Sequence, residues 1–161
     1  MDDVLHIASR NRAQIILGLC ALGVIIGSLG PWAHIVLETI SGVAGDGQLT
    51  LFLGVFTGAF TLLEVFRHTG SRARYISLTV AFFLAGLIGL NVWLSVGSTI
   101  AQGGLNASVG WGLQLMTVTA FMGGTVAYLQ VKAISREKRR QRRLRREEEE
   151  AIPEIERAKQ L

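Results

Sequence analysis

The stretch AQIILGLCALGVIIGSLGPWAHI, Ala13 to Ile35, contains no Asp, Glu, Lys or Arg. Three further apolar runs are of similar length, close to the roughly 20 residues that a helix needs to cross a bilayer core of about 30 Å. Hydrocarbon offers backbone groups no water partner and so admits only helices or closed barrels, and the period-two alternation of a barrel is absent. The sequence therefore predicts an all-α integral membrane protein, a bundle of four transmembrane helices at about Ala13–Ile35, Leu49–Phe66, Tyr75–Val96 and Val109–Val131.

The basic residues divide the chain into a transmembrane domain, residues 1–131, and a charged tail, residues 132–161. Lys and Arg near helix ends stay on the cytoplasmic side of a membrane. We therefore expect both termini in the cytoplasm and the loops Glu38–Asp46 and Gly97–Ser108 outside. The sixteen Lys and Arg residues lie in three segments: Arg10 and Arg12 before the first helix, Arg67, Arg72 and Arg74 between the second and third, and Lys132 onward.

The aromatic residues predict the same topology. Tryptophan and tyrosine favour the two membrane interfaces. Tyr75 and Tyr128 fall at the helix ends expected inside, and the tryptophans fall at the ends expected outside: Trp32, Trp93 and Trp111.

The outer loops predict a short extracellular β-hairpin. His34 to Ser41 is rich in β-branched residues and is followed by Gly42 and the turn Gly45-Asp46-Gly47, so a strand is expected there. Gly97 to Gln102 in the second loop is expected to pair with it. His34, Glu38 and Asp46 are residue types that ligate metals, but they lack motif spacing. Ordinary loop polarity is the preferred interpretation, and no metal or cofactor is expected.

Small residues predict how the helices pack. A small residue recurs four positions after another in each helix, which lets backbones approach closely and gain dispersion contacts. Counting from the helix ends places all the pairs near mid-membrane, so a compact bundle is expected. The alternative is that one of these faces binds a partner helix. The pairs are Gly23 and Gly27, Gly54 and Gly58, Ala85 and Gly89, and Ala120 and Gly124.

Polar residues within the spans are few. Glu64 is the only one that carries a full charge, and Arg67 and His68 follow at i+3 and i+4, so a local ion pair is the preferred interpretation. A proton-coupled or partner-pairing role is the alternative. Asn91 and Gln114 lie at similar depths, which predicts a hydrogen bond between the third and fourth helices; a substrate site is the less favoured alternative.

The tail predicts a cytoplasmic extension of the fourth helix. Lys132 to Ala151 is dense in helix formers and lacks Gly and Pro, so the helix is expected to continue for several turns. Its basic turns lie nearest the bilayer and its glutamates further out, which favours binding to anionic lipid headgroups or a protein partner. A topology anchor in a solvated helix is the preferred interpretation, and docking to a protein partner is the alternative. Nucleic acid is not expected as a partner, because no aromatic residue interleaves the arginines for base stacking. The basic residues are Arg136, Lys138, Arg139, Arg140, Arg142, Arg143, Arg145 and Arg146.

Three short motifs carry a family resemblance: Gly30-Pro31-Trp32, Gly45-Asp46-Gly47 and Val109-Gly110-Trp111-Gly112. With them, residues 13–131 resemble the uncharacterised small four-helix (tetraspan) membrane proteins found widely in high-GC Gram-positive bacteria. That resemblance implies a bacterial plasma membrane and no particular activity. The architecture is also distantly similar to claudin-like proteins, but the first outer loop lacks their paired cysteines and their GLW motif.

The sequence favours a protein without catalytic activity. It contains no Walker loop, dinucleotide glycine fingerprint, HExxH or CxxC motif. We therefore expect an accessory or scaffold subunit of a larger bacterial membrane complex, a transporter of lipids or solutes or a respiratory complex. It would dock through the glycine faces and the charged helix. One alternative is a small channel or carrier, acting as a homo-oligomer with Glu64, Asn91 and Gln114 along its path. A second alternative is a membrane exclusion or immunity protein.

Overall fold

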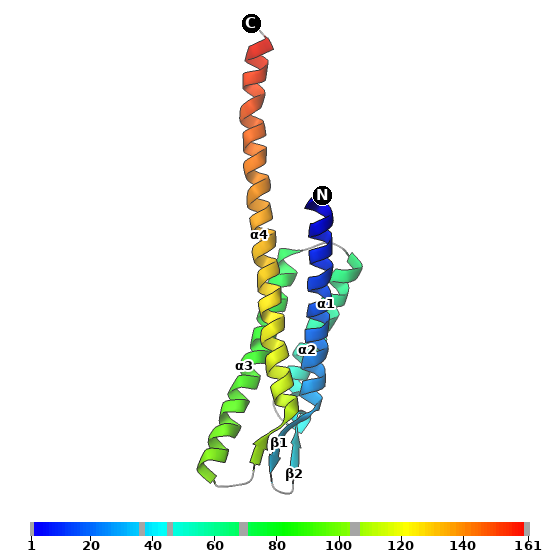
Figure 1. The fold of residues 1–161 in the computed structure, drawn as a ribbon, viewed down its shortest axis with the longest axis vertical. Helices are drawn as coiled ribbons and strands as arrows, with labels where there is room; N and C mark the ends of the chain where they lie inside the picture. Colours follow the sequence, from blue (N-terminus) through cyan, green and yellow to red (C-terminus); the bar gives the residue numbers. More distant parts are fainter. Residues whose placement is uncertain (1, 36–37, 45–46, 68–70, 104–106, 160–161) are drawn as a thin grey trace.

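The chain forms four long helices side by side, with a small β-sheet at one end and both termini at the other, in a computed structural model (Figure 1). The structure describes residues 2–35, 38–44, 47–67, 71–103 and 107–159. Each of the four helices carries a segment long and apolar enough to cross a membrane, so that prediction is confirmed. The helices are α1 (Asp2–Leu29), α2 (Gly47–Arg67), α3 (Arg72–Gly103) and α4 (Trp111–Lys159).

Large apolar side chains cover the outside of the bundle. On α2, Phe52 is 67% exposed and Phe66 is 79% exposed, and α1 and α3 carry similar stripes of exposed Leu and Ile. In water, contiguous apolar surface of this extent is rare on a soluble monomer. In hydrocarbon it matches its surroundings. The chain is therefore a membrane-embedded, multi-pass protein.

Helix α4 lies at the centre of the bundle. It packs along α1 on one side and α3 on the other, whereas α2 packs against α1 and less extensively against α3. Leu113, Met116, Ala120 and Ala127 of α4 are all fully buried. They repeat at i, i+3, i+7 and i+14, so they form one stripe along the helix, as expected for a helix whose inner face meets two neighbours.

The first apolar run does not stay helical to Ile35. Helix α1 ends at Leu29, and the chain continues as strand β1 (Pro31–Ile35). Pro31 has no amide hydrogen and cannot bond a carbonyl one turn earlier, which favours the end of the helix at this point. Strand β1 pairs antiparallel with β2 (Glu38–Ser41), with His34 opposite Thr39. The single strand predicted from His34 to Ser41 is therefore two paired strands, and a 3-10 turn (Gly42–Ala44) follows them.

The third strand of the sheet lies elsewhere than predicted. Gly97 to Gln102 belongs to α3, which continues to Gly103. The partner of β1 from the second loop is β3 (Ala107–Val109), and the strand order is β2-β1-β3. Nothing in 97–102 stops a helix, whereas Gly103 and Gly104 form a typical helix-ending pair. The prediction of a sheet built from both outer loops was right, and its second segment was wrong.

Trp32 connects the end of α1 to Gly110, just before α4, through two hydrogen bonds. Its indole N–H donates to the carbonyl of Gly27 at 3.0 Å, and the amide of Gly110 donates to the Trp32 carbonyl at 2.8 Å. The Gly27 carbonyl is among the last four carbonyls of the helix, which accept no hydrogen bond from an amide of the same helix. Trp32 is 5% exposed. It is therefore a packed core residue at the end of the bundle that carries the sheet.

The fourth helix continues far beyond the bundle, as predicted for the tail. Helix α4 has 49 residues, and at about 1.5 Å per residue it is about 74 Å long. A bilayer core takes up only about 30 Å of that length. Figure 1 shows its last part standing alone at the end of the molecule that also holds the N-terminus. From Arg136 to Glu147 every side chain is exposed.

Candidate functional site

The small residues of α1 pack against α4. A Cβ built on Gly27 would lie 2.6 Å from the Met116 amide nitrogen and 2.7 Å from the Gly112 carbonyl oxygen. One built on Gly23 would meet the Thr119 side chain. The two backbones therefore meet at Gly27, where no side chain fits.

The other three pairs also face helices of the same chain. Gly54 packs on Ile25 and Val24 of α1, and Gly58 packs on Ala21. Gly89 of α3 meets Thr117 and Met116 of α4, and Gly124 of α4 meets Phe83 of α3. Ala85 and Ala120 are buried. All four small-residue pairs therefore contribute to packing within the bundle.

Glu64 forms an ion pair across two helices. Its Oε2 lies 2.8 Å from Nη1 of Arg74 on α3, and Glu64 is only 1% exposed. The Arg74 side chain is 26% exposed, so its far side reaches the surface at this end of the bundle. The local contacts predicted with Arg67 and His68 involve side chains outside the described part of the chain. The arginine that the structure pairs with Glu64 is ten residues away in sequence.

Buried polar side chains lie at the same end of the bundle as this ion pair. Helices α1 and α2 run antiparallel with Ser28 opposite Thr50, joined by a 2.8 Å hydrogen bond between hydroxyls. Continuing that register brings Gln14, which is buried, to the level of Glu64. Tyr75, next to Arg74 on α3, is also buried. Buried polar side chains therefore gather at the end of the bundle that holds the termini.

Sequence reasoning missed a polar stripe on α2. Thr50, Thr57, Thr61 and Glu64 are all buried and repeat at i, i+7, i+11 and i+14, which puts them on one helix face. Each threonine hydroxyl donates to a carbonyl three or four residues earlier on its own helix, at 2.7 to 3.0 Å. The spacing was visible in the sequence, but threonine is common in apolar helices. The Thr57 and Thr61 hydroxyls are satisfied within α2, and Thr50 also shares a hydrogen bond with Ser28 of α1, so the stripe serves packing.

Asn91 and Gln114 do not meet. Both side chains are exposed, and no hydrogen bond joins them among the described residues. Helix α3 presents Phe82, Gly86 and Gly89 to α4. Asn91 instead lies seven residues after Leu84 and four residues after Leu87, so it continues the exposed stripe that these leucines form on α3. The predicted bond between α3 and α4 is therefore wrong, because similar depth does not place two residues on facing sides of their helices.

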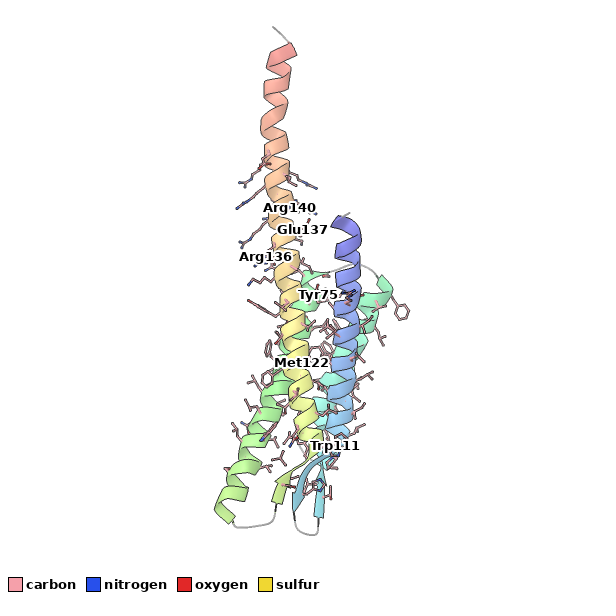
Figure 2. The ribbon with its side chains drawn as sticks, viewed as in Figure 1. Tyr75, Trp111, Met122, Arg136, Glu137 and Arg140 are labelled. Atoms are coloured by element: carbon pink, nitrogen blue, oxygen red, sulfur yellow. The ribbon has the colours of Figure 1, made fainter. Side chains whose placement is uncertain are left out.

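A basic hollow lies where α4 leaves the bundle. It has a volume of about 240 Å³ and is lined by Arg72 at the start of α3 and by Ser135, Lys138, Arg139 and Arg142 of α4. The four α4 residues repeat at i, i+3, i+4 and i+7, so they share the face that overhangs the start of α3. Arg136 and Arg140, labelled in Figure 2 on the extended part of α4, do not line it.

The four cations of the basic hollow have no ion pair with any described residue. Ser135 donates its hydroxyl to the Val131 carbonyl at 2.7 Å and so stays fixed against its own helix. The hollow therefore presents several positive charges to one small volume, which can hold an anion. Arg136, Arg140, Arg143, Arg145 and Arg146 are exposed on the same helix without lining it.

Of the possible metal ligands in the outer loops, only the His34 side chain is described. His34 on β1 forms a 3.3 Å hydrogen bond between its Nδ1 and the Thr39 hydroxyl. The side chains of Glu38 and Asp46 lie outside the described residues. Within the described part of the chain, no three His, Cys, Asp or Glu side chains form a group able to hold a metal.

Compared with protein-family models, with curated proteins and with solved structures, the chain matches none of them.

Proposed function

We propose that this protein is a non-catalytic accessory subunit that anchors the long α4 helix in a membrane and presents it to a larger membrane complex. The observation that carries the proposal is the continuous α4, on which every side chain from Arg136 to Glu147 is exposed. A helix that is charged all round needs a partner surface or water to hold it, because it has no apolar face to bury. A docking role accounts for the length of the exposed part of α4.

The bundle itself supports a scaffold more than a carrier. Helix backbones meet at Gly27 with no room for a side chain, and close packing of this kind resists the sliding that alternating access requires. The buried carboxylate of Glu64 is held by Arg74. Asn91 and Gln114 lie exposed on the outside of the bundle. These positions therefore do not support a transport path through a single chain that would join Glu64, Asn91 and Gln114.

We also propose that the end carrying the termini faces the cytoplasm of a bacterial plasma membrane. Arg12, Arg72 and Arg74 lie at that end of their helices, together with the basic part of α4, and cations at helix ends favour the cytoplasmic side. The small β-sheet then lies outside. In this arrangement a cytoplasmic or membrane partner meets α4 directly.

The test is gentle detergent extraction of the tagged full-length protein at native expression, with mass spectrometry of the copurified proteins and of the intact particle. We expect stoichiometric recovery of a larger membrane complex. Replacing Glu147 and Glu148 with Gln should lower that recovery severalfold, because these residues follow the basic turns on the side away from the membrane, where we propose that the partner binds. The matched control replaces Asp2 and Asp3 with Asn, which removes two carboxylates from the other chain end. Recovery of lipids and self-contacts alone would overturn the proposal and favour an oligomeric channel.

A further inference from the structure

The basic hollow lies at the depth of lipid headgroups. Arg72, one of its walls, is the first residue of the apolar span of α3, which continues to Ser98. Tyr128, a residue type that favours membrane interfaces, is exposed on α4 seven residues before Ser135, or about 10 Å along the helix. The hollow therefore lies just outside the hydrocarbon, where phosphate groups of lipids are found.

The hollow is built by two helices. Helix α4 contributes Lys138, Arg139 and Arg142, and Arg72 comes from α3, 66 positions before Lys138. Arginine donates paired hydrogen bonds in a planar fork that fits phosphate oxygens. The N-terminus of α3 adds its partial positive charge at the same place. A tail that only attracts the membrane surface needs no residue from α3 and no hollow between the two helices.

Size restricts the ligand. Pockets for drug-sized molecules typically occupy about 300–1,000 Å³, and the hollow has about 240 Å³. One headgroup phosphate with its glycerol is small enough to enter, while the acyl chains remain in the bilayer. Basic pockets between membrane helices bind anionic headgroups in this way.

We propose that the basic hollow formed by Arg72, Ser135, Lys138, Arg139 and Arg142 binds the phosphate headgroup of one anionic glycerophospholipid. The inference does not depend on the accessory role or on which side of the membrane the hollow faces. It separates the α4 cations into two sets. Those lining the hollow hold a specific lipid, and those on the other faces contribute only diffuse attraction.

The experiment counts retained lipids. The full-length protein is reconstituted with phosphatidylcholine and a minor fraction of phosphatidylglycerol, extracted in mild detergent and measured by native mass spectrometry. We expect one phosphatidylglycerol retained per chain. A carboxylate-headed lipid of the same charge should be retained about tenfold less, since it offers fewer oxygens to the guanidinium groups. Free glycerol phosphate, added at the same concentration, should not displace the lipid.

Two matched variants remove three cations each. Lys138→Gln with Arg139→Gln and Arg142→Gln should retain about tenfold less phosphatidylglycerol than Arg136→Gln with Arg140→Gln and Arg143→Gln. Both sets lose the same charge from exposed positions, so the difference reports the hollow. Arg72→Gln should also lower retention, whereas Arg12→Gln, an exposed arginine on α1, should not.

Three outcomes would overturn the proposal. Equal losses in the two triple variants would assign retention to diffuse charge. Equal retention of the carboxylate-headed lipid would do the same. Displacement by glycerol phosphate would make the hollow a site for a soluble phosphate compound. The thermal unfolding temperature of each variant, measured without added anionic lipid, tests whether the bundle is intact. We expect no change in that temperature, because all the substituted side chains are exposed.

Discussion

At the scale of single residues, Glu64 and Arg74 show that the two partners of an ion pair can differ in burial. Glu64 is enclosed on α2, whereas Arg74 on α3 keeps part of its side chain at the surface. A buried charge that loses its partner costs much more than one that can turn to water. The structure therefore predicts that the two single substitutions are unequal.

Arg74→Gln should lower the free energy of unfolding by about 3 kcal/mol, because the buried Glu64 carboxylate loses its ion pair with Arg74. Glu64→Gln should cost about 1 kcal/mol, since the freed Arg74 can reach water and the amide keeps hydrogen-bonding capacity. Unfolding in mixed detergent and sodium dodecyl sulfate micelles measures both values. Equal losses, or a larger loss for Glu64→Gln, would contradict the enclosed position of Glu64. Arg72→Gln, at an exposed arginine two residues earlier, serves as the control.

Glycine positions differ in the same residue-specific way. Gly27→Ala should destabilise the bundle by about 2 kcal/mol, because the added methyl group would meet the backbone of α4 at Met116 and Gly112 and no side chain can move aside. Gly18→Ala lies on the same helix with nothing within 4 Å of the added Cβ. It should be neutral or slightly stabilising, because alanine is the better helix former. The same unfolding assay compares the two, and a similar loss for both would refute the close approach at Gly27.

At the scale of elements, α4 couples the bundle to the exposed tail as one rod. Its inner half is held by α1 and α3, and its outer half has no apolar face to bury. The helix nevertheless continues, because residues 132–151 are strong helix formers and contain neither Gly nor Pro. Motion of the tail relative to the membrane is therefore restricted by the packed half.

Spin labels at Tyr128 and Arg146 test this rod. The two positions are 18 residues apart, so a continuous helix places their backbones about 27 Å apart at about 1.5 Å per residue. We expect one narrow distance distribution by pulsed electron paramagnetic resonance. Arg140→Pro should broaden and shift the distribution, because proline removes a helix hydrogen bond and kinks the axis. A broad distribution in the unsubstituted protein would show that the extension is not a continuous helix.

At the scale of the whole molecule, the sheet and the termini lie at opposite ends of the bundle (Figure 1). Strands β1, β2 and β3 bring both outer loops together, and Gly110 donates to Trp32 across them. The other end carries the ion pair, the basic hollow and α4. The two ends of the molecule therefore differ in structure and charge, and they face different compartments in any membrane that it spans.

Cysteine labelling in cells tests the proposed orientation. In a Cys20→Ser background, Thr39→Cys and Arg146→Cys introduce single thiols at exposed positions at the two ends. A membrane-impermeant maleimide should label Thr39→Cys in intact cells and Arg146→Cys only after the membrane is opened. Both variants label after detergent treatment as a control. The reverse pattern would place the α4 extension outside the cell and contradict the cation rule for this chain.

The sequence by itself determined the four helices and the extension of the fourth. Membrane-spanning length and hydropathy are properties of a contiguous run, so they can be read without knowing any neighbour. The end of α1 near Pro31 was also within reach, although a continuous apolar run concealed it. The small-residue pairs correctly indicated close packing, since missing side chains permit it wherever the partner is.

Only the tertiary structure decided which residues meet. Glu64 of α2 pairs with Arg74 of α3, Asn91 and Gln114 are both exposed and form no hydrogen bond with each other, and Arg72 joins three α4 cations around the basic hollow. These contacts depend on how each helix is rotated about its axis and how far it is shifted against the next. Rotation and shift are set by the summed packing of two helix surfaces, and no single stretch of the chain contains both.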